Sequence, residues 1–298
     1  MLRVNQIVRR MTMREYVIYT DSACDISQEL LQEWGVRVLQ LSVQFKGENE
    51  SFLDYEMPSK LFYQKMRDGQ VAVTSAVNAD TFQKAFAATL DEGLDVLYLA
   101  FSSGLSATYN SACIAVEELR AAYPERRIQA VDTLAASAGF GLLVYLAKEK
   151  KAAGASMEEV AKYIEDIRLS SVHWFTVDDL VYLKRGGRVS AATALLGGML
   201  GIKPVLHVDN EGHLIKMSQV RGRKSSIKAL ADAYGKTKTG KGPIFISHGD
   251  CIDDAKALAE ILEKDYGAKV DLITSIGPVI GAHSGPGTLA LFYLGTER

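Results

Sequence analysis

Short apolar runs alternate with longer helical patterns along the first half of the chain. The first run, YVIYT from Tyr16, precedes a turn and the pattern DSACDISQELLQEWG. The runs Asp95–Phe101 and Ile128–Val131 precede helical patterns over about 106–122 and up to Lys151. Runs that are apolar at nearly every position are typical of strands buried on both faces, which occur in parallel sheets covered by helices. The alternation therefore predicts an α/β fold with a parallel sheet.

The second half of the chain has a different pattern. The runs KPVLHV and HLIKMSQV lie on either side of Asp209–Gly212, and a turn between two such runs predicts a β-hairpin with antiparallel strands. The strand-like runs PIFISH, KVDLITS and TLALFYL follow, with helical patterns from about Lys224 and over Asp253–Tyr266. These runs predict a second α/β unit in which the sheet is mixed.

Helix-capping signals divide the chain near residue 155. Gly154 has the position of a helix C-cap, and Ser156 with Glu159 has the spacing of a capping box for the next helix. The predicted parts are a flexible extension over 1–15, an N-terminal α/β lobe with a parallel sheet over 16–155, and a C-terminal α/β lobe with a mixed sheet over 156–298. The space between the lobes is the expected ligand site.

The composition is that of a globular protein. Of 298 residues, 48% are hydrophobic and 23% are charged, and the net charge of −2 gives no overall attraction to nucleic acid or to anionic membranes. Cys24, Cys113 and Cys251 lack the spacing of a zinc site or a disulfide framework. No apolar stretch reaches about 18 residues without a charge. These features predict a cytoplasmic protein without a metal site or a membrane span.

The strongest local motif is SSGLSATY over Ser102–Tyr109, where a buried strand ends and a helix begins. Ligands of open α/β sheets bind at this edge, and free helix N–H groups and hydroxyls there favour an anion or a polar oxygen. Thr20–Ser22 and Thr74–Ser75 are further hydroxyl-bearing segments, which a parallel sheet would bring to the same edge. Each of the three segments alone is also typical of a helix cap.

A glycine-rich turn is predicted before the last strand, over Gly281–Thr288 (GAHSGPGT). Loops of this composition let the backbone approach a ligand or a neighbouring segment closely. His283 adds an imidazole to this turn, although a lone histidine is more often structural than functional. The turn is thus a second candidate part of a site.

The segment Gly104–Thr108 also resembles the G-x-S-x-G nucleophile elbow, in the strand–turn–helix context where that motif occurs. Ser106, Asp132 and His283 would supply the nucleophile, the acid and the base in this chain order. The last position of the motif is Thr108 instead of glycine. A serine hydrolase that acts on acyl esters, with Ser106 as nucleophile, is therefore the alternative hypothesis.

Residues 184–228 form a locally basic region, with nine Lys and Arg residues against two acids. Aromatic residues are not interleaved with these charges, which disfavours nucleic acid as a partner. A solvated face is one interpretation, and a docking surface for phosphate or for an acidic protein surface is the other. The candidate docking residues are Arg185, Arg188, Arg221, Arg223 and Lys224.

Seven motifs occur together in one order: TDS at 20–22, TS at 74–75, SSGLSATY at 102–109, LKRGGRVS at 183–190, KPVL at 203–206, GRK at 222–224 and HSGPGT at 283–288. In this set and spacing, the chain resembles the DegV family from Tyr16 to its end. The resemblance implies a two-lobe lipid carrier that buries one long-chain fatty acid between its lobes and needs no cofactor. It also implies a separate fatty-acid kinase as the enzyme that makes acyl phosphate on the bound carboxylate. Transient contact with a membrane is compatible with that role in phospholipid metabolism.

The same resemblance implies which residues hold the carboxylate. Thr74 and Ser106 would contact it directly. Ser75, the backbone of Gly104 and His283 would complete the surroundings of the head group. No metal and no catalytic residue are expected on this chain.

The tail of such a ligand dominates its binding. Burial of about 14 methylenes at roughly 0.8 kcal/mol each contributes on the order of 11 kcal/mol before the costs of binding. The hydroxyls then need only orient the carboxylate for chemistry supplied by a partner. The apolar segment Ala194–Leu200 is a candidate lining for the tail, and it is equally compatible with a core helix.

Overall fold

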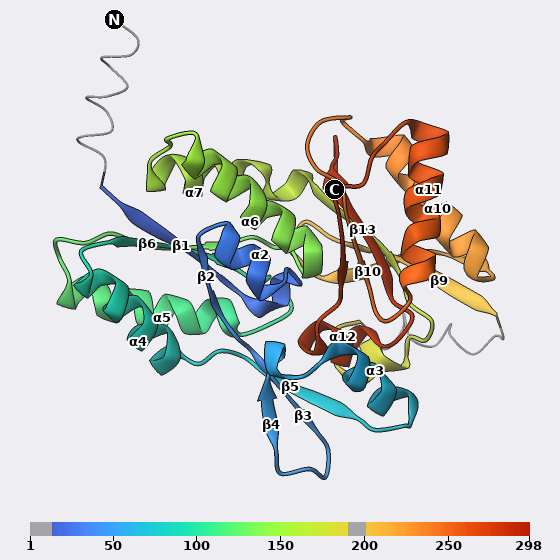
Figure 1. The fold of residues 1–298 in the computed structure, drawn as a ribbon, viewed down its shortest axis with the longest axis horizontal. Helices are drawn as coiled ribbons and strands as arrows, with labels where there is room; N and C mark the ends of the chain where they lie inside the picture. Colours follow the sequence, from blue (N-terminus) through green and yellow to red (C-terminus); the bar gives the residue numbers. More distant parts are fainter. Residues whose placement is uncertain (1–13, 190–200) are drawn as a thin grey trace, which may run out of the picture.

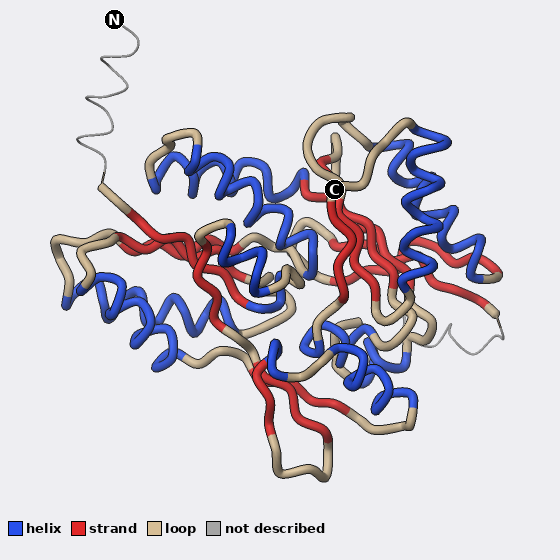
Figure 2. The backbone as a smooth tube through the Cα atoms, in the orientation of Figure 1, coloured by secondary structure: helices blue, strands red, loops and turns tan. Residues whose placement is uncertain are grey.

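The structure is a computed structural model that describes residues 14–189 and 201–298 (Figure 1). The predictions for most of the extension, residues 1–13, and for the tail lining over 194–200 concern residues outside these ranges. Two large sheets and a small third sheet form the framework, as the tube view shows (Figure 2). The chain is thus an α/β protein with two main sheets, as the alternation of strand and helix patterns predicts.

The first sheet is parallel and has the strand order β2-β1-β6-β7. Its strands are β1 (Tyr16–Asp21), β2 (Val36–Leu39), β6 (Asp95–Ala100) and β7 (Ile128–Asp132). Every residue of β1 and β6 is buried. Burial on both faces explains why these segments are apolar at nearly every position. The predicted parallel sheet is confirmed.

Helices cover both faces of the parallel sheet (Figure 1). One face carries α4 (Ala79–Asp91) and α5 (Thr108–Ala122), and the other carries α2 (Gln28–Glu33), α6 (Ser137–Ala152) and α7 (Met157–Ile167). The sheet is therefore enclosed between two layers of helices, which is the usual arrangement for parallel strands.

The helix α7 begins with the capping box that its sequence predicts. The Ser156 hydroxyl accepts the N–H of Glu159, and the Glu159 carboxylate accepts the N–H of Ser156. The expected boundary at 155/156 therefore falls in the turn between α6 and α7. The chain enters the second sheet at Ser171, after the short helix η3 (Arg168–Ser170).

The second sheet is mixed and has the strand order β10-β9-β8-β13-β11-β12. Its strands are β8 (Ser171–Thr176), β9 (Ile202–Val208), β10 (Leu214–Arg221), β11 (Phe245–His248), β12 (Leu272–Ser275) and β13 (Leu289–Leu294). The strands β11 and β12 pair in parallel, and the other neighbours pair antiparallel. The predicted mixed sheet and the predicted β9–β10 hairpin are confirmed.

One helix lies between the two main sheets. The helices α10 (Arg223–Thr237) and α11 (Ile252–Tyr266) pack on one face of the mixed sheet (Figure 1). The helix α6 contacts β8, β11 and β13 of the same sheet from its other side. Because α6 also belongs to the layer over the parallel sheet, it links the two sheets through a shared apolar core.

A third sheet of three antiparallel strands carries Thr74. Its order is β4-β3-β5, formed by β3 (Ser42–Phe45), β4 (Ser51–Leu53) and β5 (Ala72–Ser75), and α3 (Ser59–Arg67) lies in the connection to β5. Thr74 and Ser75 do not cap a helix, since the next helix, α4, is capped by Asn78. The strands of this sheet are short and carry exposed or partly exposed residues at alternate positions, so they form no continuous apolar run and the pattern missed the sheet.

The glycine-rich turn predicted over Gly281–Thr288 is wrong in its first half. Residues 278–284 form the helix α12 (Pro278–Ser284). Pro278 occupies the first helical position, where its fixed φ favours a helix start and its missing N–H costs nothing. The other short helices within the described residues are η1 (Ser22–Cys24), η2 (Asp54–Glu56) and α8 (Val181–Arg185). His283 is therefore held on a helix and not on a flexible loop.

The two main sheets are also joined by a tight polar contact. The Ser102 hydroxyl, which follows β6, donates to the carbonyl of Gly212 in the β9–β10 hairpin at 3.0 Å. Gly212 has a positive φ of 81°, and a Cβ atom there would lie 2.1 Å from the Ser102 hydroxyl oxygen. Only glycine fits both the backbone conformation and the close approach.

This contact predicts the effect of Gly212→Ala on stability. The substitution introduces backbone strain, which costs about 1 kcal/mol, and a steric overlap, which costs about 1–3 kcal/mol more. Gly240→Ala is the matched control, because Gly240 has a φ of 69° but open space around it. Denaturant unfolding should show that Gly212→Ala lowers the free energy of unfolding by clearly more than Gly240→Ala. Equal losses would contradict the role of the Ser102 contact.

Candidate functional site

A cavity of about 220 Å³ lies between the two main sheets. The parallel sheet contributes Phe101 and Leu105, which follow β6, and the mixed sheet contributes Phe175, Ala290 and Phe292. The helix α12 closes a further side of the cavity. Most of the lining side chains are apolar, which suits an apolar or amphiphilic ligand.

The cavity reaches solvent at one end. Ala76 and Ala107 both line the cavity and are exposed, so they mark its mouth. Two of the predicted site residues, Thr74 and Ser106, lie two residues and one residue before these alanines in the sequence and also line the cavity. The structure therefore brings together hydroxyls from the third sheet and from the loop that follows β6.

Each of these two hydroxyls is hydrogen-bonded to a second polar side chain. The Thr74 hydroxyl lies 2.8 Å from Nε2 of His283. The Ser106 hydroxyl lies 2.8 Å from the hydroxyl of Thr108, whose backbone N–H it also accepts at 3.2 Å. Thr108 is fully buried and His283 is mostly buried, so both supporting groups are held in place.

His283 is neutral at physiological pH. Burial and, to a smaller extent, the nearby Arg188 guanidinium lower the pKa of the His283 imidazole to about 4. Its Nδ1 atom is buried and has no hydrogen-bond partner among the described residues. Gly186 lies directly against this atom, since a Cβ there would be 2.2 Å from it. The ring is thus fixed with Nε2 directed at Thr74.

Arg188 belongs to the cavity wall. The sequence places it among the docking residues, but it lines the cavity together with Ser106 and His283. Its Nε donates to the carbonyl of Leu105 at 3.1 Å. Burial lowers the pKa of the guanidinium, and no described carboxylate pairs with it. The contact with Leu105 joins residues far apart in the chain, so no local pattern could have revealed it.

Ser75 and Gly104 are not among the residues that line the cavity, unlike Thr74 and Ser106. Ser75 is exposed and follows Thr74 in β5, so its side chain points to the opposite face of the strand. The N–H of Gly104 donates to the Ser102 hydroxyl at 3.2 Å. A Cβ at Gly104 would lie 2.9 Å from the carbonyl of Glu211. Gly104 therefore lets the loop pack against the β9–β10 hairpin.

The segment Thr20–Ser22 does not reach the cavity. All three of its residues are buried, and none of them lines the cavity. The Asp21 carboxylate accepts the hydroxyl of Tyr98 at 2.6 Å and the N–H of Phe101 at 3.0 Å. Its role is to hold the end of β6, from which the SSGLSATY motif starts.

The catalytic triad of the alternative hypothesis is not assembled. Ser106 is hydrogen-bonded to Thr108, and His283 to Thr74. Asp132 accepts the N–H groups of Ser103 and Leu134 and so caps a loop instead of orienting a histidine. An imidazole with a pKa of about 4 is also a weak base for activating a serine.

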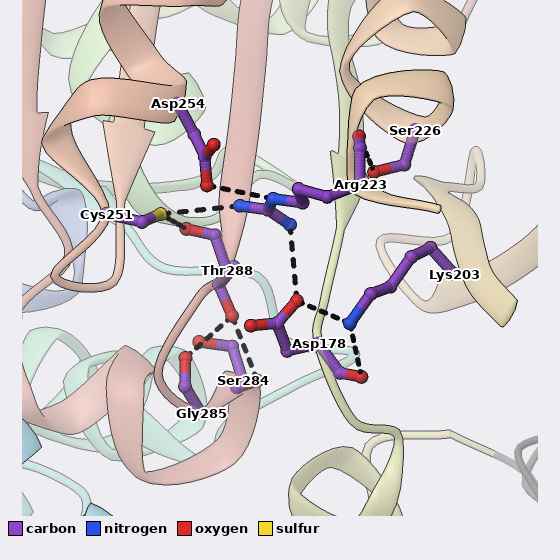
Figure 3. A network of polar contacts seen from close by, with 9 residues as sticks. All are labelled: Asp178, Lys203, Arg223, Ser226, Cys251, Asp254, Ser284, Gly285 and Thr288. Carbon is purple, nitrogen blue, oxygen red and sulfur yellow. Dashed lines mark hydrogen bonds and ion pairs between the residues drawn. The ribbon is translucent and has the colours of Figure 1, made fainter. Parts of the chain in front are cut away.

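Of the five candidate docking residues, Arg188 lines the cavity, and the other four separate into two groups. Arg185, Arg221 and Lys224 are exposed. Arg223 is instead paired with Asp254 at 2.9 Å and with Asp178 at 3.7 Å, in the network that Figure 3 shows. The same network includes Lys203, which pairs with Asp178, and it extends through Cys251 to Thr288 at the cavity. Arg223 therefore braces the fold beneath the exposed charges.

Two buried carboxylates hold the amino end of α12. Asp25 accepts the N–H of Gly277 at 2.8 Å, and Asp54 accepts the N–H of Val279 at 3.0 Å. Burial raises the pKa of Asp25 well above its usual range and raises that of Asp54 to about 7. Because His283 lies on the same helix, these acids position one wall of the site.

No helix in the described part of the chain is long and apolar enough to cross a membrane. Residues 14–189 and 201–298 also contain no group of three or more His, Cys, Asp or Glu side chains that could hold a metal ion.

The fold and the cavity define a two-lobe α/β protein with a mostly apolar cavity between its sheets. Residues 15–296 match the DegV family, which is described as an uncharacterised protein family. The chain belongs to the DegV family.

Known relatives extend this similarity over nearly the whole chain. A DegV domain-containing protein of Clostridium perfringens is 43% identical, over 96% of this chain and 99% of the relative. A protein of Thermotoga maritima named fatty acid-binding protein is 33% identical, over 91% of this chain and 95% of the relative. A DegV family protein from Thermus thermophilus, whose structure is described as fatty acid binding, has a TM-score of 0.83 and 32% identity over 94% of this chain and 99% of its own.

The buried acids predict an unusual dependence of stability on pH. Between about pH 4 and pH 7, the native protein keeps the Asp54 proton that the unfolded chain releases, so the free energy of unfolding falls as the pH rises. Asp54→Asn keeps the acceptor for Val279 but removes this titration, while Asp21 and Asp25 still titrate. The fall should therefore be smaller in the variant, by on the order of a few kcal/mol across this range in urea unfolding. A difference from wild type that is the same at every pH would contradict this expectation.

Proposed function

We propose that this protein binds one long-chain fatty acid in the cavity between its sheets, with the carboxylate at Thr74 and Ser106. The observation that carries the proposal is an enclosed apolar cavity whose mouth has two hydroxyls, each backed by a second polar side chain. The relatives that are named fatty acid-binding proteins support the same ligand class.

The backing residues leave both hydroxyls free to donate. The neutral His283 carries one proton, and when Nε2 donates it to the Thr74 oxygen, the Thr74 hydrogen is available to a ligand. In the same way, when Thr108 donates its hydroxyl hydrogen to the Ser106 oxygen, the Ser106 hydrogen is available to a ligand. Two hydroxyl donors that line the same cavity suit the two oxygens of a carboxylate.

Arg188 supplies the counter-charge. A partly buried guanidinium without a paired carboxylate is costly, and an ionised fatty acid would offset that cost. His283 adds no second charge because it is neutral. The head group would thus meet one cation and two hydroxyl donors, while the tail lies among apolar side chains.

The protein acts in this proposal as a carrier and not as the enzyme. The carboxylate would lie near the mouth, which Ala76 and Ala107 mark, and therefore within reach of a partner. We propose a separate fatty-acid kinase as that partner, which joins a phosphoryl group to a carboxylate oxygen and forms acyl phosphate. The exposed cations Arg185, Arg221 and Lys224 are the proposed docking residues for an acidic surface of this kinase.

Thr74→Val tests the head-group contact. Valine keeps the shape of threonine but removes the hydroxyl, and the loss of one hydrogen bond to a charged group should raise the Kd for palmitate by about tenfold or more. Ser106→Ala should have a similar effect, for the same reason. Ser75→Ala is the matched control and should bind like wild type, because Ser75 is exposed on the opposite face of β5. Titration calorimetry measures all four proteins, and a wild type that binds no fatty acid would refute the proposed function.

The double change Arg221→Glu and Lys224→Glu tests the docking surface. Acyl-phosphate formation with the fatty-acid kinase of the same organism should slow by about tenfold or more, because the charges then repel an acidic partner. The bound fatty acid should remain, since both residues lie outside the cavity lining. Lys264→Glu is the control. Lys264 is exposed and lies roughly 15 Å along α11 from Asp254, the residue that pairs with Arg223 between the two mutated positions. Loss of the fatty acid, or an equal loss of rate in the control, would refute this docking assignment.

A further inference from the structure

The lining of the cavity is exposed at its mouth and buried at Phe292 and His173. At the mouth, Ala76 and Ala107 are exposed. Thr288, which directly precedes β13, and Ala290 and Phe292 within β13 line the cavity in succession, because alternate residues of an extended chain face the same side. At roughly 3.4 Å per residue, Phe292 lies about 14 Å beyond Thr288, whose hydroxyl donates to the carbonyl of Ser284 beside His283. Phe292 therefore lies far from the head-group end.

At that depth, Phe292 is paired with His173. The two residues are directly opposite in the register of β13 and β8. Their rings meet edge to face, with centroids 5.2 Å apart and planes at 86°. Both side chains line the cavity, and they are only 2% and 1% exposed. The pair forms a surface across the buried end of the cavity.

The His173 ring is fixed by hydrogen bonds on both sides. Its Nδ1 lies 2.8 Å from the carbonyl of Ser171, which can only accept, so Nδ1 is the donor. Its Nε2 accepts the N–H of Ala136 at 3.3 Å. Both ring nitrogens are thus bonded to backbone groups, and the ring cannot turn aside without losing two hydrogen bonds.

The helix α6 prevents the pair from retreating. A Cβ atom on Gly139 would lie 2.3 Å from Nε2 of His173 and 2.5 Å from a ring carbon of Phe292. The backbone of α6 is therefore in direct contact with both rings, and the space behind them is filled. A ligand that reaches these rings cannot push them further into the protein.

We propose that the His173–Phe292 pair is the end wall of the acyl-chain site and sets the longest fatty acid that fits. The inference rests on the proposed function, since it concerns the tail of the same ligand. It assigns a role to His173, a buried neutral histidine that the head-group chemistry does not use. The wall would exclude longer chains by contact instead of by charge.

Phe245 provides a matched control for Phe292. It lies directly opposite Phe292 on β11, so it faces the same side of the sheet, and it is 3% exposed. Its ring packs against Tyr145 of α6, with centroids 6.0 Å apart. Phe245 is not among the residues that line the cavity. Shortening it removes a similar core side chain without opening the end wall.

The experiment compares wild type with Phe292→Leu, Phe292→Ala and Phe245→Leu. Each purified protein is stripped of lipid and offered an equimolar ladder of saturated fatty acids of increasing length. The bound acids are then extracted and identified by mass spectrometry. Phe292→Leu is the milder change, and thermal melting confirms that each variant is folded.

The two Phe292 variants should select longer chains than wild type, with an advantage of about fourfold in affinity for each additional methylene that fits. Phe245→Leu should keep the wild-type profile. The inference is overturned if folded, loaded Phe292 variants keep the wild-type profile, or if Phe245→Leu shifts the profile equally. A wild type that takes up no fatty acid would overturn the proposed function first, so the two failures are distinguishable.

Discussion

The cavity depends on how the amino end of α12 is held. Asp25 and Asp54 come from the first part of the chain, and they accept the N–H groups at the start of a helix that belongs to its last part. The side chains of this helix close the cavity and carry His283 to Thr74. Because these tethers are polar and buried, they fix the helix without filling the space beside it with apolar side chains. Burial of the two acids costs stability. The space beside α12 remains available to a ligand.

The remaining contacts follow from the same separation between polar edges and an apolar interior. Hydrogen bonds join the sheets at their rims, as between Ser102 and Gly212, whereas α6 joins them through packing. A fatty acid matches this arrangement, with a tail for the interior and a carboxylate for the rim. In the proposed complex, Arg188 and the two hydroxyls would need only to orient the head group, since the tail would contribute most of the binding free energy.

The two main sheets could be predicted from the sequence because their central strands are buried on both faces and read as continuous apolar runs. The third sheet could not, since its strands are short and half exposed. The helix α12 was missed because its capping acids lie more than two hundred residues away in the chain. Local patterns therefore predicted elements whose burial is regular and missed those fixed by distant partners.

The site was predicted to a similar extent. Thr74, Ser106 and His283 were singled out through family resemblance, and the structure places them around one cavity. Arg188 and Arg223 looked like docking residues because a run of positive charge in a sequence does not show which members turn inward. Their partners, Leu105 for one and Asp178 and Asp254 for the other, are brought near only by the fold.

A crystal structure of the protein loaded with palmitate would test the central claim most directly. The carboxylate is expected within hydrogen-bond distance of the hydroxyls of Thr74 and Ser106, and the tail is expected to run towards Phe292. A carboxylate at the opposite end of the chain, or palmitate bound outside this cavity, would contradict the claim.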